Sequence, residues 1–218
     1  MKNEAKDADM THPSDTPLFL ASNHLSRRTH DILKERLEED SSALPRTLSP
    51  TAFAVLERLV TVLLPQEEIL GQQTLNLALR VDMALSGPRD GWRFAELPSD
   101  IQAWEQALLT LNDLSISQFE RPFPQLEDSA VEAFLDGMGE GKVGLHTPDR
   151  LQPPQMQKWS LDLRADVIEC FLADPRVQDR LGMSANLNGG DERFQGFETV
   201  QANEREDFEP ITKICSAA

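Results

Sequence analysis

The chain has 218 residues, of which 39% are apolar and 27% charged, and its 37 acidic side chains outnumber its 21 lysines and arginines. A chain of this length buries roughly 70% of its unfolded surface, so it needs no disulfide or metal staple, and one compact domain with tails is expected. The net charge of −16 argues against a nucleic-acid groove, which needs clustered basic residues, and against adsorption to anionic membranes.

The N-terminal part is polar, and residues 1–23 are predicted to be disordered. No cleavable signal is visible, so the sequence alone indicates a cytoplasmic protein. Arg27-Arg28 are similar to the twin arginines of an export signal, but residues 35–40 are charged where such a signal is apolar. We therefore interpret residues 25–39 as a solvated, highly charged helix.

Helical periodicity dominates the middle of the chain, and no stretch reaches the ~18–20 apolar residues of a membrane-spanning helix. Direct membrane insertion is therefore not expected. Ser49-Pro50 form a helix start, with Pro65 as the stop. Further helices are predicted over residues 71–86, from Ser99, over 127–136, from the proline pair at 153–154 to Ala173, and from Asp174-Pro175 to Gly182.

Apolar side chains at spacings of three and four residues identify the buried faces of two of these helices. In the helix that starts at Ser99, with Gln102 placed for a capping box, the predicted seam consists of Ile101, Trp104, Leu108 and Leu111. In the helix after the proline pair it consists of Met156, Trp159, Leu163, Val167 and Phe171.

These patterns predict an all-α fold, an irregular bundle of five to six helices. A disordered N-terminal arm precedes the bundle, and an extended, largely non-helical C-terminal segment follows it. The expected division is residues 1–47 for the arm and charged helix, 48–183 for the bundle and 184–218 for the C-terminal arm.

None of the candidate motifs in the sequence indicates catalysis, a cofactor or a metal. Gly139–Gly144 match GxGxxG, but a helix precedes them and prolines follow, so we predict a loop between helices. Residues 184–195 imitate a calcium loop, yet Gln195 occupies the position of the bidentate Glu. The four histidines have no metal spacing, and the two cysteines form no CxxC. We therefore predict no catalytic, cofactor-binding or metal residues and no bound cofactor.

Residues 184–210 combine three glycines, three asparagines and nine charges with the apolar side chains of Phe194, Phe197, Val200 and Phe208. This is too aromatic for an ordinary disordered tail and too irregular for a helix. The segment is interpreted as an extended arm whose phenylalanines pack on another surface. That surface is either the helical bundle of the same chain or a partner chain, and both remain open.

Three pieces of the sequence, in this order, carry a resemblance to a known family. The first piece is Leu48–Phe53 running to Leu63–Pro65, and the second is Phe171–Pro175. The third combines Asn188–Asp191, Gly196-Phe197, Asn203–Glu206 and Phe208–Pro210. Over about residues 48–210 the chain resembles the gluconate 2-dehydrogenase subunit 3 family.

The resemblance implies a helical accessory protein that is not an enzyme by itself. Such a subunit associates with a large flavin-containing subunit of a membrane-bound sugar or polyol dehydrogenase, and a multihaem cytochrome often completes the complex. It helps the large subunit fold and be exported, in a chaperone-like way, which implies a periplasmic complex. The chain departs from the family in lacking an apolar segment after Arg27-Arg28, in its shorter spacing from Gly190 to Gly196-Phe197, and in its acidic end.

On this basis the partner-binding residues are expected in the C-terminal arm, with buried aromatic side chains as anchors. They are Gly189, Gly190, Phe194, Gly196, Phe197 and Phe208. Two alternatives remain open: a cytosolic helical adaptor unrelated to redox chemistry, and a stand-alone enzyme with a carboxylate site in an interhelical cleft.

Overall fold

A computed structural model describes the chain at residues 20, 24–38, 43–87, 94–183, 190–191 and 204. Within these ranges the backbone forms α-helices and one short 3₁₀ helix, and no strand, which confirms the predicted all-α fold. The eight helices described are α1 (Arg27–Glu38), α2 (Pro50–Leu63), α3 (Glu67–Leu70), α4 (Leu77–Ser86), α5 (Asp100–Phe119), α6 (Asp128–Gly139), α7 (Pro153–Leu172) and α8 (Pro175–Arg180). The 3₁₀ helix, Phe123–Gln125, connects α5 to α6.

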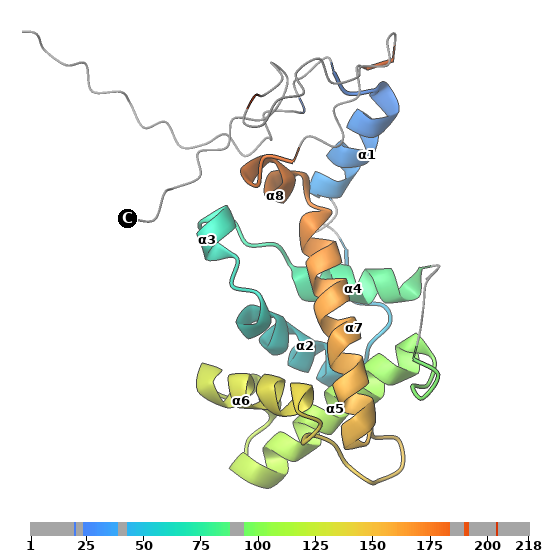
Figure 1. Cartoon of the computed structure of the whole chain (residues 1–218), viewed down its shortest axis with the longest axis vertical. Helices are drawn as coiled ribbons and strands as arrows, with labels where there is room; N and C mark the ends of the chain where they lie inside the picture. The colour runs from blue at the N-terminus through green and yellow to red at the C-terminus, as the bar shows by residue number, and fades with distance from the viewer. Residues whose placement is uncertain are drawn as a thin grey trace, which may run out of the picture.

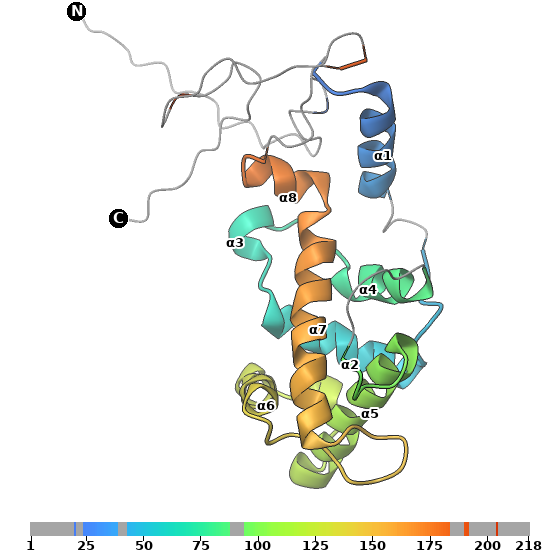
Figure 2. The ribbon, with the colours of Figure 1, turned by 45° about the vertical axis from the view of Figure 1, so that its right-hand side comes forward.

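Helix α7 forms the axis of the molecule. It runs from α5 and α6 at one end to α8 at the other, and α4 and α2 pack between these ends (Figure 1). α1 lies at the α8 end, and the turned view keeps this order (Figure 2). The two ends of the bundle are therefore formed by different pairs of helices.

The buried face of α7 is the one that its apolar spacing predicts. Met156, Trp159, Leu163, Val167 and Phe171 are all buried. The ring of Trp159 meets that of Trp104 from α5 edge to face, with centroids 5.3 Å apart and an interplanar angle of 81°. Such aromatic pairs add about 0.5–1.5 kcal/mol beyond the area that they bury.

Two helix starts predicted from the sequence are also confirmed. The side chain of Ser49 accepts a hydrogen bond from the backbone N–H of Ala52 and caps α2. Asp174 caps α8 in the same way, accepting the N–H of Arg176. In both cases a proline occupies the first helical turn, where its missing N–H costs nothing.

The helix predicted over residues 71–86 is shorter than expected, because α4 begins only at Leu77. The buried side-chain amide of Gln66 donates to the carbonyl of Leu75 and accepts its N–H, which holds the preceding loop in a non-helical form. Asn76 then caps α4 by accepting the N–H of Leu79. The single-turn helix α3 was not predicted.

The start of α5 differs from the prediction in two ways. The hydroxyl of Ser99 bonds the side chain of Gln102 instead of the backbone, so the capping box does not form. Ile101 is 45% exposed and lies outside the seam, whereas Trp104, Leu108 and Leu111 are buried as expected. The side chain of Ile101 lines an open pocket of about 420 Å³ instead, together with residues such as Thr47 and Arg150.

Helix α1 is not fully solvated. Its Leu33 is 2% exposed and forms a small separate cluster with Leu20 and Leu25, against which Leu37 packs. A much larger cluster of buried apolar residues, from Leu48 to Val177, makes the main core. α1 therefore adds a second layer on α8 and does not insert into the main core.

Candidate functional site

The most highly charged buried position in the described chain is at the junction of α4, α7 and α8. Asp174 follows α7 directly, and its carboxylate is inaccessible to solvent. It accepts hydrogen bonds from Nη2 of Arg80 on α4, at 2.8 Å, and from Nε and Nη2 of Arg176 on α8, at 3.0 and 2.8 Å. One carboxylate thus joins three helices through two guanidinium groups.

These partners determine the protonation state of Asp174. Burial raises the pKa of the carboxyl group, but the hydrogen bond from Arg176 and the positive charges of Arg80 and Arg176 outweigh that effect. The net pKa lies below the ordinary aspartate value. Asp174 is therefore an ionised structural group, not a proton donor at neutral pH.

A second buried carboxylate, Asp82, stands two positions after Arg80 on α4. It accepts the backbone N–H groups of Arg46, Thr47 and Leu48 at 2.6 to 3.2 Å. The hydroxyl of Thr47 in turn donates to the carbonyl of Asp82 at 2.9 Å. This bonding fixes the segment that leads into α2.

Arg80 and Asp82 were missed by sequence analysis, because charged residues on a helix are normally assigned to its solvent face. A signal was present, since they interrupt an otherwise apolar helix over residues 77–86. Each reaches one of the sequence pieces that carry the resemblance: Asp82 binds the backbone at Leu48, and Arg80 binds Asp174. The two residues therefore hold those two pieces on opposite sides of α4.

A pocket of about 240 Å³ opens beside this junction. Its lining is formed by Arg36, Arg80, Met83, Ala84, Cys170 and Ala173. Nη1 of Arg36 donates to the carbonyl of Ala173, and the carbonyl of Arg36 accepts from Arg80, both at 3.4 Å. The arginines of the pocket thus link α1 to α4 and to the end of α7.

Two residues of the C-terminal arm, Gly190 and Asp191, are hydrogen-bonded at the start of α1. The N–H of Gly190, a residue with φ of +81°, donates to the carbonyl of His24 at 3.0 Å. The carboxylate of Asp191 accepts the N–H of Arg27 at 3.0 and 3.1 Å, at the first residue of α1. A carboxylate at this position also interacts favourably with the helix dipole.

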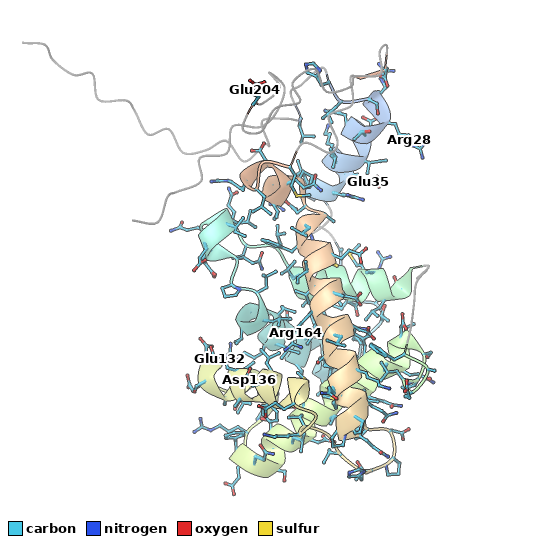
Figure 3. The ribbon with its side chains drawn as sticks, viewed as in Figure 1. Arg28, Glu35, Glu132, Asp136, Arg164 and Glu204 are labelled. Atoms are coloured by element: carbon cyan, nitrogen blue, oxygen red, sulfur yellow. The ribbon has the colours of Figure 1, made fainter. Side chains whose placement is uncertain are left out.

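An open basin of about 680 Å³ borders this contact, lined by Arg27, Arg28, Asp31, Ile32, Glu35 and Asp191. Arg28 and Glu35 lie along α1 in Figure 3. Arg27 and Arg28, which are similar to an export signal, are exposed and belong to the start of a folded helix.

Among the residues expected to bind a partner, only Gly190 lies within the described ranges. Its N–H is used inside the chain, as given above. The other five, Gly189, Phe194, Gly196, Phe197 and Phe208, lie outside the described residues. Their role in partner binding stays a prediction.

The GxGxxG sequence is the predicted loop between helices. Gly141, with φ of +68°, ends α6: its N–H bonds the carbonyl of Met138, and the N–H of Lys142 bonds that of Gly137. A Cβ on Gly144 would lie 2.3 Å from the backbone nitrogen of Pro153. Gly141 and Gly144 are thus required by this loop, whereas Gly139 is not.

The described ranges contain no group of three or more His, Cys, Asp or Glu side chains that could hold a metal ion. Nor does any helix in those ranges have the length and apolar content to cross a bilayer.

Comparison with known proteins gives one match. A family model described as gluconate 2-dehydrogenase subunit 3 matches residues 50–187, from the start of α2 to beyond α8. The matched region contains the first two sequence pieces, apart from Leu48 and Ser49, and ends before Asn188, where the third begins. No curated protein and no solved structure matches the chain.

Proposed function

The chain belongs to the gluconate 2-dehydrogenase subunit 3 family, and from this premise we propose that it is a non-catalytic subunit of a flavin-dependent sugar or polyol dehydrogenase complex. Its role is to bind and stabilise the large catalytic subunit, which carries the flavin. The family match over residues 50–187 is the observation that carries this proposal. A multihaem cytochrome is the proposed third member of the complex.

The proposed mechanism of stabilisation is mass action. A protein that binds only the folded form of its partner stabilises that form by RT ln(1 + [L]/Kd), about 2.7 kcal/mol when its concentration is ~100-fold above Kd. This effect is larger for a surface that is ordered before binding, because each side chain that binding immobilises costs about 0.5–1.5 kcal/mol of affinity.

The buried charges of the bundle support this reading. Asp82 fixes the segment before α2, and Asp174 ties the start of α8 to α4. Both carboxylates are engaged by donors of the chain itself, and both serve to order the bundle. The outer faces of a bundle held rigid in this way lose little conformational entropy when a partner binds.

The C-terminal arm, residues 184–218, is proposed as one contact with the large subunit. Gly190 and Asp191 are bonded at the start of α1, so the arm departs from the α1 and α8 end of the bundle. Phe194, Phe197 and Phe208 are the proposed anchors, since buried aromatic side chains dominate interface energies.

Co-expression of the tagged chain with the large dehydrogenase subunit of its own organism tests the proposal. The expected result is a complex of defined mass that shows flavin absorbance, whereas the isolated chain shows none. Phe197→Asp should weaken the complex without lowering the melting temperature of the isolated chain. Leu44→Asp, at a side chain that is 74% exposed, is the matched control and should bind normally.

Two results would contradict the proposal. One is that the chain does not co-purify with the large subunit although that subunit is folded. The other is that the isolated chain binds flavin or oxidises a sugar. An equal loss of thermal stability in isolated Phe197→Asp would assign the arm to the chain's own core instead.

A further inference from the structure

We propose that the large subunit also docks on a second surface, formed by α6 and α7, through an amphipathic helix that carries basic residues. This inference rests on the proposed function. The surface, called the α6–α7 face below, is defined by Glu132 and Asp136 of α6 and by Leu161, Arg164 and Ile168 of α7.

The apolar part of the α6–α7 face lies on α7. Leu161 is 55% exposed and Ile168 is 48% exposed, although α7 contributes five residues to the core from its opposite side. They are seven residues apart, so they project from one side of the helix about 10 Å apart along its axis. That spacing fits two apolar anchors of a partner helix, which recur one to two turns apart.

This side of α7 adjoins α6. Gln157 stands four residues before Leu161 on the same side, and its Nε2 donates to the carbonyl of Gly139, the last residue of α6. Figure 3 labels Arg164 of α7 and Glu132 and Asp136 of α6 on the same side of the molecule, and the two helices pack against each other. The apolar pair therefore has the carboxylates of α6 along one border.

Neither carboxylate at this border forms an ion pair within the described part of the chain. Glu132 and Asp136 are exposed, and no ion pair or hydrogen bond joins either side chain to a described residue. The neighbouring cation, Arg164, directs Nη1 to the carbonyl of Ser160 in its own helix, at 2.9 Å. Several other exposed carboxylates do have cationic partners: Asp128 with Arg58, Asp113 with Arg150, Glu140 with Lys142 and Glu96 with Lys158.

Two like charges four residues apart on one helix face repel each other and weaken the helix. A partner that brings lysine or arginine to this border would relieve that repulsion. Its apolar side chains would cover Leu161 and Ile168 at the same time. Charge complementarity therefore selects an amphipathic helix with an apolar stripe and a basic flank, and it disfavours a second copy of this acidic chain.

The test measures the affinity of the purified large subunit for five forms of the full chain. Three are the unmodified chain, the double variant Leu161→Asp/Ile168→Asp and the charge variant Glu132→Gln/Asp136→Asn. The other two are controls, Ile101→Asp for the double variant and Glu67→Gln/Glu68→Gln for the charge variant. Ile101 is matched to Ile168 in residue type and is 45% exposed on α5. Melting temperatures of all forms confirm folding, and Leu161→Ala/Ile168→Ala replaces the double variant if that one is destabilised.

We expect the double variant to lose affinity by a factor of about 10 or more, and its control to bind normally. The charge variant should associate about 3-fold more slowly at low salt, and this difference should vanish at high salt. Glu67→Gln/Glu68→Gln removes the same charge from α3 and should leave the association rate unchanged.

Three other outcomes would overturn the proposed docking on the α6–α7 face. Normal binding by the double variant overturns the docking site and leaves the proposed function intact. No binding by the unmodified chain overturns both. Self-association of the chain that the double variant abolishes would assign the face to a second copy, which also overturns the inference.

Discussion

Arg80 and Asp174 form an ion pair, with 2.8 Å between Nη2 and Oδ2, where neither side chain exposes more than 5% of its surface. The pair joins the middle of α4 to the start of α8, and Arg176 binds the same carboxylate from the other side. A charge in such a place is tolerated only because it is fully paired and hydrogen-bonded. The junction of α4, α7 and α8 therefore depends on these charges.

The first prediction concerns Asp174→Asn. The change keeps the shape of the side chain but leaves two guanidinium groups without their anion, so it should destabilise the chain by about 3–5 kcal/mol at neutral pH. Urea unfolding, followed by helix circular dichroism, measures this difference.

The pH dependence of that difference is a further check. The pKa of Asp174 is lowered by folding, so its stabilisation is complete above the unfolded value of about 3.9 and disappears as the pH falls through the lower folded-state pKa. The stability of the original chain should therefore approach that of Asp174→Asn in strong acid. A difference that stays constant down to about pH 2 would contradict the assignment.

The second prediction concerns Asp82→Ala. It would leave the N–H groups of Arg46, Thr47 and Leu48 without the carboxylate that now accepts them. Hydrogen bonds to charged groups contribute about 1.5–3 kcal/mol, and we expect a loss of at least that size in unfolding free energy. Glu169→Ala, at an exposed residue of α7, should change stability by less than about 0.5 kcal/mol.

The third prediction separates two glycines of the GxGxxG sequence. A Cβ at Gly144 would meet the backbone at Pro153 and Gln152, whereas one at Gly139 has no heavy atom within 4 Å. Gly144→Ala should therefore cost about 1–3 kcal/mol or more, and Gly139→Ala should be neutral or slightly stabilising. Thermal unfolding of both variants measures the difference; equal effects would show that the turn into α7 is not the reason for Gly144.

The fourth prediction concerns the bond between Asp191 and α1. Asp191→Ala removes the acceptor for the N–H of Arg27, and loss of such a cap costs about 0.5–2 kcal/mol. Because α1 packs outside the main core, the loss should be local. Hydrogen exchange should accelerate in α1 and stay unchanged in α7, and Glu204→Ala, an exposed acid of the same arm, should change neither.

Strict apolar spacing and local caps were sufficient to predict much of the fold. The five seam residues of α7 are all buried, and Ser49 and Asp174 cap the helices that follow them. These features depend on neighbours within a few residues, which the sequence displays directly. The family was also recognisable from short pieces of sequence in a fixed order.

The features that were missed depend on contacts between distant residues. Gln66 shortens α4 through bonds to Leu75, and Arg80 reaches Asp174 across 94 positions. Periodicity assigns polar side chains to solvent and cannot identify the few that have buried partners. For the same reason the sequence left open whether the arm packs on its own bundle or on a partner, and it did not indicate that Gly190 and Asp191 are bonded to the start of α1.

Titration gives the sharpest test of the proposal that this chain stabilises a flavin-containing catalytic subunit. The melting temperature of the purified large subunit, followed by its flavin fluorescence, is measured at increasing concentrations of the purified chain. We expect a rise that continues with the logarithm of the concentration above Kd, because the chain binds only the folded subunit. A melting temperature that stays constant at every concentration would contradict it.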